Sequence, residues 1–353
     1  MNSTDAYAVL AGKHMFPESK HYRRVLESLM TPRQAQMVAL LPLSVEELAQ
    51  KLNMDVPEIE RELEVLFKKG VIIASSKGYK FAHTTGQLHD ATTSPMFLDL
   101  VKDRDMLEAW QDFCETEYNE FLRMAMAFQK GPAMLRVVPA RKALEGLEGV
   151  EPYEDAHQVI KAAESLAVCH CACKQRVVAT RHECARTPTV DTCLQMNKGA
   201  DYVIKRGSGR PISHEEAMQI VDFAEETGLI HQLPNSKLMN LNVMCNCCTD
   251  CCLALAPFEG DLELIGKIWE KSRYEASVDQ DLCNGCQTCI ERCPFDAIQM
   301  QKVEGSKKLK AKVDPEKCFG CGLCVITCEP HALKFKCVRS ADHIPAEPYK
   351  YTV

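Results

Sequence analysis

Two stretches decide the fold of this chain: CNGCQTCIERC at residues 283–293 and CFGCGLCVITC at residues 318–328. Both have the spacing Cys-x2-Cys-x2-Cys-x3-Cys, which is typical of proteins that hold two 4Fe-4S clusters. Three cysteines on one tight loop reach three corners of a cubane, and the fourth ligand comes from the other half. The expected ligands are Cys283, Cys286, Cys289 and Cys328 for the first cluster, and Cys318, Cys321, Cys324 and Cys293 for the second.

The two stretches belong to an internal duplication. An offset of 35 residues superimposes all four cysteines, and it also places Val278 on Val313. Each half predicts a strand, a cysteine loop, a helical turn and a second strand. The halves differ after the last cysteine, where Pro294 follows Cys293 but Glu329 follows Cys328. A carboxylate disfavours the addition of an electron to a nearby cluster, so we expect two different reduction potentials.

A second group of cysteines lies upstream, between residues 166 and 253. Its ten members are Cys169, Cys171, Cys173, Cys184, Cys193, Cys245, Cys247, Cys248, Cys251 and Cys252. Tight clusters of this kind favour metal ligands over disulfides. We expect one or two additional iron-sulfur clusters, because ten thiols exceed the four that one cubane uses and the chain already carries clusters. Zinc is the alternative, since one cysteine pair from each segment is enough for a tetrahedral site.

The N-terminal region predicts three helices followed by a β-hairpin, over residues 31–82. Ser44 with Glu47 and Asp55 with Glu58 have the capping-box pattern of helix starts. Val56, Ile59, Leu63, Leu66 and Phe67 form an apolar stripe at helical spacing. This arrangement resembles a winged helix-turn-helix domain. Its third helix is rich in glutamate, which argues against DNA binding and favours docking or oligomerisation.

The remaining composition sets the broad class. A long helix is expected over 96–129, with Cys114 as a small buried hydrophobe. Further along the chain, the default expectation for Lys174 is a solvated lysine, and the alternative is that its charge beside Cys173 raises the potential of a cluster. A net charge of −7 gives no general attraction to nucleic acid or anionic lipid. Since no apolar run approaches the roughly 18 residues of a membrane span, and the start lacks a signal-peptide pattern, we expect a cytoplasmic protein.

These features predict an α+β multidomain chain. The expected divisions are a winged-helix-like domain at 1–95, a mainly helical, Cys-rich middle domain at 96–272, a two-cluster 4Fe-4S ferredoxin domain at 273–340, and a tail at 341–353.

The middle region resembles a family of 4Fe-4S binding proteins of anaerobic bacteria and archaea. The resemblance rests on RVVPA at 136–140, EPYEDA at 151–156, CHCACK at 169–174, GRPISHEEA at 209–217, AEETGLIHQ at 224–232 and CNCCTDCC at 245–252. The C-terminal repeat is similar to a bacterial-type two-cluster ferredoxin. The resemblance implies that the metal ligands are Cys171, Cys173, Cys184, Cys193, Cys247, Cys248, Cys251 and Cys252, and it supports Cys169 and Cys245 less.

We interpret the chain as an iron-sulfur electron-transfer protein rather than an enzyme. No Rossmann fingerprint, Walker loop or nucleophile-base pair is evident. Two-electron chemistry would therefore require a redox partner, such as a flavin- or metal-containing oxidoreductase, in an oligomer or larger complex. The first alternative is an oxidoreductase with its own open iron-sulfur site among the middle cysteines. The second is a redox- or iron-sensing DNA-binding regulator.

Overall fold

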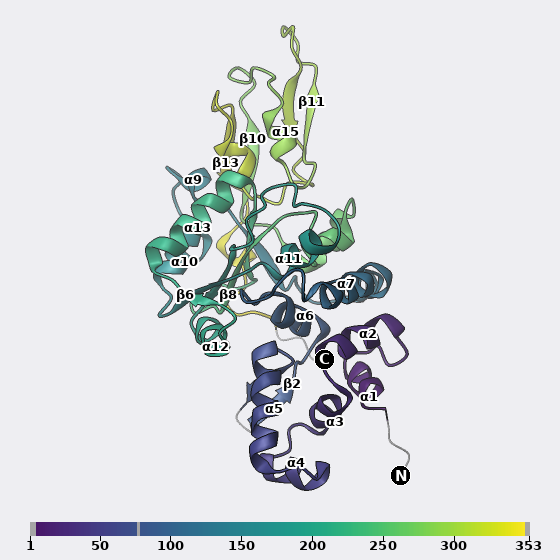
Figure 1. Ribbon diagram of the computed structural model, residues 1–353. Coiled ribbons are helices and arrows are strands. Elements are labelled where there is room, and N and C mark those ends of the chain that lie inside the picture. Colours follow the sequence, from purple (N-terminus) through teal and green to yellow (C-terminus); the bar gives the residue numbers. More distant parts are fainter. Residues whose placement is uncertain (1–4, 76–77, 350–353) are drawn as a thin grey trace. The chain divides into compact units, whose positions relative to one another are not determined.

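The computed structural model describes residues 5–75 and 78–349, and its contacts divide these residues into two compact units (Figure 1). The first unit combines the N-terminal region to Phe121 with residues 169–183 and 202–210. The second contains residues 122–168, 184–201 and the chain from Pro211 onward. Each unit is assembled from segments that are not continuous in sequence, whereas the division expected from the sequence followed continuous stretches.

The first unit is mainly helical. Its elements are α1 (Ala6–Lys13), α2 (Lys20–Leu29), α3 (Pro32–Leu40), α4 (Val45–Leu52), α5 (Val56–Lys69), β1 (Ile72–Ser75), β2 (Gly78–Phe81), α6 (Thr85–Thr93), α7 (Arg104–Phe113), a π-helical turn (Cys114–Tyr118) and α11 (Ala172–Thr180). Two further helices, α8 (Asn119–Phe128) and α12 (Lys198–Arg206), contribute residues to both units.

Local sequence signals explain the N-terminal helices. Ser44 and Glu47 form a reciprocal capping box at the start of α4, whereas Asp55 caps α5 without a return bond. Gly70 ends α5 in the left-handed conformation that glycine adopts without strain. The three helices α3, α4 and α5 are followed by the antiparallel pair β1 and β2, and Ser76 and Lys77 of the expected turn lie outside the described residues. The winged-helix interpretation stays a prediction.

Two sequence expectations in this unit need correction. Val56 is 37% exposed, so the buried stripe of α5 begins at Ile59. The long helix expected from residue 96 begins at Arg104, because the Asp99 carboxylate accepts the amides of Val101 and Lys102 and holds them in a turn. The expected burial of Cys114 is confirmed.

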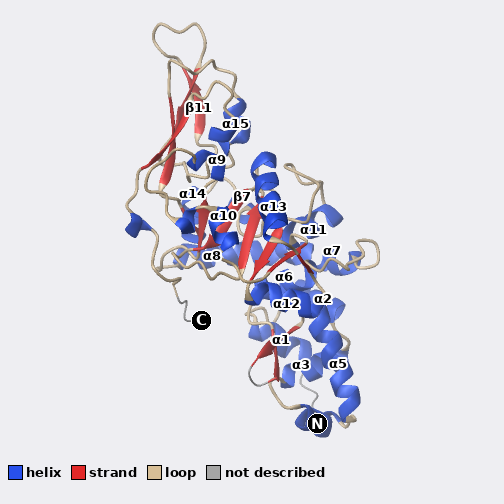
Figure 2. Ribbon diagram, turned by 90° about the vertical axis from the view of Figure 1, so that its left-hand side faces the viewer, coloured by secondary structure: helices blue, strands red, loops and turns tan. Residues whose placement is uncertain are grey.

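A seven-stranded sheet forms the frame of the second unit (Figure 2). Its strands, in spatial order, are β6 (Arg210–Pro211), β4 (Leu166–Cys169), β5 (Cys193–Met196), β8 (Val243–Cys247), β7 (Ile230–Pro234), β3 (Leu135–Val138) and β9 (Trp269–Glu270). Helices outnumber strands in the middle of the chain, but its sequence did not indicate this sheet.

Alternating side chains separate the two faces of the sheet. Val138, Leu233 and Met244 join one core with α10 (Ala156–Lys161) and α13 (His214–Thr227). Val137 and Cys247 belong to the core on the other face. The remaining middle elements are α9 (Arg141–Leu144), α14 (Leu262–Ile268) and 3-10 turns at Pro152–Glu154 and Ala256–Phe258.

The C-terminal module, residues 274–337, has the element order that the duplication predicts. Its first half is β10 (Tyr274–Val278), α15 (Thr288–Arg292) and β11 (Ile298–Gln301), and its second is β12 (Lys310–Val313), α16 (Leu323–Ile326) and β13 (Leu333–Cys337). The strands pair across the halves, β10 with β13 and β11 with β12. The module is followed by a 3-10 turn at Ala341–His343.

Candidate iron-sulfur and metal sites

The C-terminal module contains two similar pockets, each bordered by four cysteines. The first is bordered by Cys283, Cys286, Cys289 and Cys328. The second is bordered by Cys293, Cys318, Cys321 and Cys324. In each pocket three cysteines come from one half of the repeat and the fourth from the other. These are the two groups that the spacing predicts.

The backbone of the two cysteine loops repeats with the sequence. Gly285 and its equivalent Gly320 have φ values of 74° and 69°. A Cβ atom at Gly285 would collide with the carbonyl of Leu309, so glycine is required by both conformation and space. Gln287 and its equivalent Gly322 are also left-handed, with φ values of 71° and 74°. These conformations turn each loop tightly enough for three sulfurs to face one pocket.

Amide groups donate to the sulfurs around both pockets. The amide of Ala311 lies 3.5 Å from the Cys283 sulfur, that of Leu333 lies 3.4 Å from Cys328, and that of Ala297 lies 3.3 Å from Cys293. Such donors stabilise the negative charge of coordinated thiolates and tune the potential of a cluster. The pockets therefore fit a cubane in ligand number, in the spacing of ligands along the chain and in polarity.

The two pockets differ in exposure. Cys318, Cys321 and Cys324 are buried, whereas Cys286 is exposed. Burial raises the pKa of the Cys321 thiol, while the hydrogen bond from the Thr288 hydroxyl lowers the pKa of Cys286. The pocket around Cys321 thus needs a positively charged metal centre to hold its sulfurs as thiolates.

Comparison with known families agrees with this geometry. Residues 282–332 match the model of a 4Fe-4S dicluster domain. The C-terminal module is a 4Fe-4S ferredoxin-type domain. The match to this family model supports an iron-sulfur electron-transfer role. No curated protein matches the chain. Among the described helices, none has both the length and the apolar character needed to cross a membrane.

The second unit gathers three of the middle cysteines around a carboxylate. Cys184, Cys248, Cys251 and Asp250 place one ligand atom each within 4.8 Å of one another. Hydrogen bonds from Cys248 and, to a smaller extent, from Cys251 lower the pKa of the Cys184 thiol. The hydrogen bond with Cys184 raises the pKa of the Cys248 thiol. Sequence analysis did not predict Asp250, although its position between two cysteine pairs in CNCCTDCC was a usable signal.

A different set of middle cysteines surrounds strand β8. Cys247 exchanges side-chain hydrogen bonds with Cys245 and Cys252. The register that pairs Leu194 with Met244 places Cys193 of β5 opposite Cys245 of β8. Residues two apart on a strand, and residues directly opposite on neighbouring strands, share a face of the sheet. Cys193, Cys245 and Cys247 are thus brought to one face, and the hydrogen bond with Cys247 places Cys252 beside them. Cys245 belongs to this group more firmly than the resemblance implied.

The CHCACK segment lies in the first unit. There a hydrogen bond joins Cys171 to Cys173. This hydrogen bond and the burial of the thiol both raise the pKa of Cys171. Lys174 is fully buried, so the expectation of a solvated lysine is wrong. The lysine lies near the Cys171 sulfur, where its positive charge lowers the cost of a buried thiolate. Burial raises the pKa of neighbouring Cys169 to about 11.

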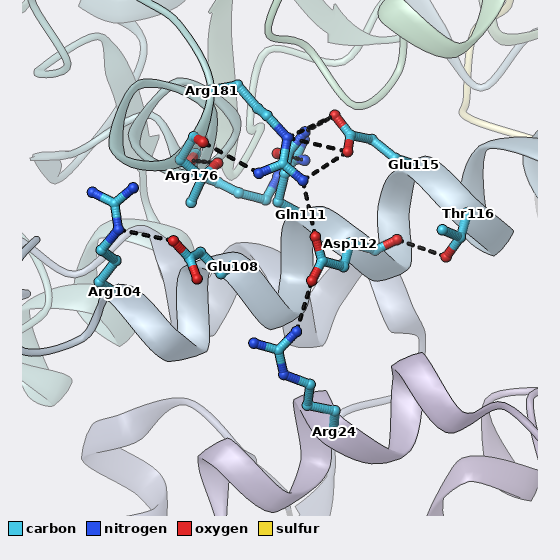
Figure 3. A network of polar contacts seen from close by, with 10 residues as sticks. Arg24, Arg104, Glu108, Gln111, Asp112, Glu115, Thr116, Arg176 and Arg181 are labelled. Carbon is cyan, nitrogen blue, oxygen red and sulfur yellow. Dashed lines mark hydrogen bonds and ion pairs between the residues drawn. The ribbon is translucent and has the colours of Figure 1, made fainter.

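Helix α11, which begins directly after Cys171 and contains Cys173, is fixed to α7 by a polar network (Figure 3). Arg181 binds Asp112 at 2.9 Å and Glu115 at 2.8 Å. Arg176 donates to Gln111 and, at 3.0 Å, to Nε2 of His89. Nδ1 of His89 lies 2.9 Å from the Asp90 carboxylate, and His89, Asp90 and Cys173 place one ligand atom each within 4.8 Å of one another.

Proposed function

We propose that this chain is an iron-sulfur electron-transfer protein that connects a ferredoxin-type domain to a metal site in its middle region. In this proposal Cys283, Cys286, Cys289 and Cys328 hold one 4Fe-4S cluster, and Cys318, Cys321, Cys324 and Cys293 hold the other. Clusters of this type supply one-electron chemistry when bound. The protein would serve as an accessory subunit or redox partner of an anaerobic oxidoreductase with a flavin or another metal cofactor.

The observation that carries the proposal is a continuous apolar core within the second unit. Cys318, Cys321 and Cys324 share this core with Cys247 and Cys252. The amide of Ala140, which follows strand β3, donates to the carbonyl of Cys321 at 2.9 Å. The buried pocket is therefore joined to the sheet that carries Cys245 and Cys247 by shared apolar packing and by this hydrogen bond. This arrangement favours the set Cys193, Cys245, Cys247 and Cys252 as the next redox site.

The first test is the metal content and reducibility of the anaerobically purified chain. Iron and sulfide analysis should give about eight of each for the ferredoxin-type domain, and about four more of each for the additional site. Dithionite reduction followed by electron paramagnetic resonance should show the corresponding signals. Protein with about eight irons, all of them accounted for by the ferredoxin-type domain, would contradict the relay.

The second test uses Cys247→Ser, with Cys337→Ser as the matched control. Cys337 is an exposed thiol at the end of β13 and borders neither pocket. In Cys247→Ser the ferredoxin-type signals should remain reducible, while the additional signal disappears. The control should retain every signal. If Cys247→Ser also retains every redox centre, the middle site is not a relay through this cysteine.

A further inference from the structure

The group of Cys184, Cys248, Asp250 and Cys251 differs from the other cysteine sets in the kind of ligand it offers. Cys184 opens the irregular segment that leads to strand β5, and the other three residues lie in the turn that follows β8. All three cysteines are buried, and Asp250 is half-buried. The site therefore joins two segments that are more than 60 residues apart through three sulfurs and one carboxylate.

The compactness of this group favours a single ion over a cubane. Four ligands around one tetrahedral zinc ion lie about 3.8 Å apart when they are sulfurs, because each Zn–S bond is about 2.3 Å long. The Asp250 carboxylate oxygens lie 3.5 Å from the Cys251 sulfur and 3.9 Å from the Cys184 sulfur. All four ligand atoms fit within 4.8 Å.

The ferredoxin-type domain provides an internal comparison. Its thiolates would each bind a different iron at the corners of a cube, which requires the sulfurs to be spread more widely. Within the described chain, no three of the eight cysteines at its pockets come within 4.8 Å of one another. The sulfurs at the two ferredoxin-type pockets are thus spread more widely than the sulfurs of Cys184, Cys248 and Cys251.

The neighbours of the group support a metal-bound state. The amides of Arg186 and Thr187 donate to the Cys184 sulfur, two and three residues further along the chain. The amide of Ala185 donates to Oδ2 of Asp250 at 2.8 Å. Donors of this kind orient metal ligands and stabilise their charge. A carboxylate held against buried sulfurs is also an arrangement that a divalent cation stabilises.

We propose that Cys184, Cys248, Cys251 and Asp250 bind one zinc ion in tetrahedral geometry. Four protein ligands leave no open position, so the ion is structural rather than catalytic. It ties the segment after Cys184 to the turn after β8. The inference is independent of the electron-transfer proposal, which uses the separate set of Cys193, Cys245, Cys247 and Cys252.

Elemental analysis of the full chain tests this site. We expect about one zinc per chain that survives dialysis against EDTA. Cys248→Ser should lose this zinc without loss of iron or sulfide, and Cys337→Ser should keep it. Asp250→Asn, which preserves the size of the side chain, should weaken zinc binding at least about tenfold in competition with a chromophoric chelator.

Two measurements guard against misfolded variants and identify the ligands. The ferredoxin-type signals in electron paramagnetic resonance should be unchanged in Asp250→Asn, which shows that the domain is intact. X-ray absorption at the zinc edge should give three sulfur ligands and one oxygen ligand in the wild-type chain, with a changed oxygen shell in the variant. A wild-type chain without zinc, or a Cys248→Ser chain that loses about four irons and four sulfides, would overturn the proposal. The iron content beyond about eight per chain, and the loss of the additional signal in Cys247→Ser, decide the electron-transfer proposal separately.

Discussion

The crossed arrangement of cysteines gives a test at the level of single ligands. We expect Cys286→Ser and Cys328→Ser to abolish the same cluster, because both cysteines border the first pocket. Cys293→Ser and Cys321→Ser should abolish the other. Electron paramagnetic resonance combined with redox titration distinguishes the two clusters by their potentials. A result in which Cys328→Ser and Cys321→Ser remove the same cluster would assign the ligands by sequence order instead.

The charge of Glu329 is expected to lower the potential of the first cluster. This exposed carboxylate acts electrostatically on Cys286, which borders the first pocket. Glu329→Gln should therefore raise the potential of that cluster alone. The shift should be a few tens of millivolts at most, since an exposed charge contributes less than about 1 kcal/mol and about 1.4 kcal/mol corresponds to roughly 59 mV for one electron.

Glu215→Gln is the matched control for this change. Glu215 is an exposed residue in the first turn of α13, outside the ferredoxin-type domain. Protein-film voltammetry or a redox titration should show no shift in this variant. Equal shifts in both variants would mean that net charge, not the position of Glu329, controls the potential.

Single residues show where sequence reasoning was sufficient. The spacing of the C-terminal cysteines is imposed by the loop that carries them, so the two groups around the pockets were predictable. Asp250 was not predicted, although its position between two cysteine pairs was a usable signal. Cys245 was supported weakly, since its position became meaningful only when strand β8 placed it beside Cys247. Lys174 was misjudged because burial depends on tertiary contacts.

At the scale of elements, a buried ion pair anchors the first strand of the ferredoxin-type domain. Arg273 binds Glu154 at 2.6 Å, and the Tyr274 hydroxyl donates to the same carboxylate at 2.9 Å. Burial raises the pKa of the Glu154 carboxyl, but hydrogen bonds from Arg273, the Glu151 amide and Tyr274 outweigh it, and the net pKa is lowered. The charged form of Glu154 therefore stabilises the fold.

Removal of this charge should destabilise the second unit. Glu154→Gln leaves Arg273 buried without its partner, which costs about 3 kcal/mol. Since the folded pKa of Glu154 is lowered, its contribution is complete above the unfolded value of about 4.3 and is lost as the pH falls through the folded value. Hydrogen exchange of β10 should give the same difference between wild type and variant at about pH 5 and pH 8. A difference that grows as the pH falls would contradict this sign.

Element boundaries show the limits of periodicity. Capping residues located the start of α4 and α5 and glycine located the end of α5, because these signals act within one turn. The start of α7 was placed eight residues too early, since apolar spacing alone does not reveal the turn held by Asp99. The short strands of the middle sheet are even less evident, because four or five residues contain too little pattern to separate strand from helix.

At the scale of the whole molecule, the duplication could be recognised in the sequence because both halves have the same cysteine spacing. The seven-stranded sheet was not, since its strands pair across long separations in sequence and follow no repeat. The compact units show the same limit, as each combines remote segments. Cysteine patterns therefore predicted the clusters that the C-terminal domain supports, whereas the grouping of the middle cysteines became evident only with the sheet that places several of them.

Removal of iron should unfold the ferredoxin-type domain without unfolding the first unit. Residues of all four strands border the first pocket, and the strands are only four or five residues long. Loss of the clusters leaves eight thiols in place of metal bonds that close the fold. After oxidation and iron chelation, hydrogen-exchange mass spectrometry should show lost protection over 274–337 and retained protection in α2 and α7, together with a changed circular dichroism spectrum. Unchanged protection over 274–337 in iron-free protein would show that the apolar side chains alone hold this domain together.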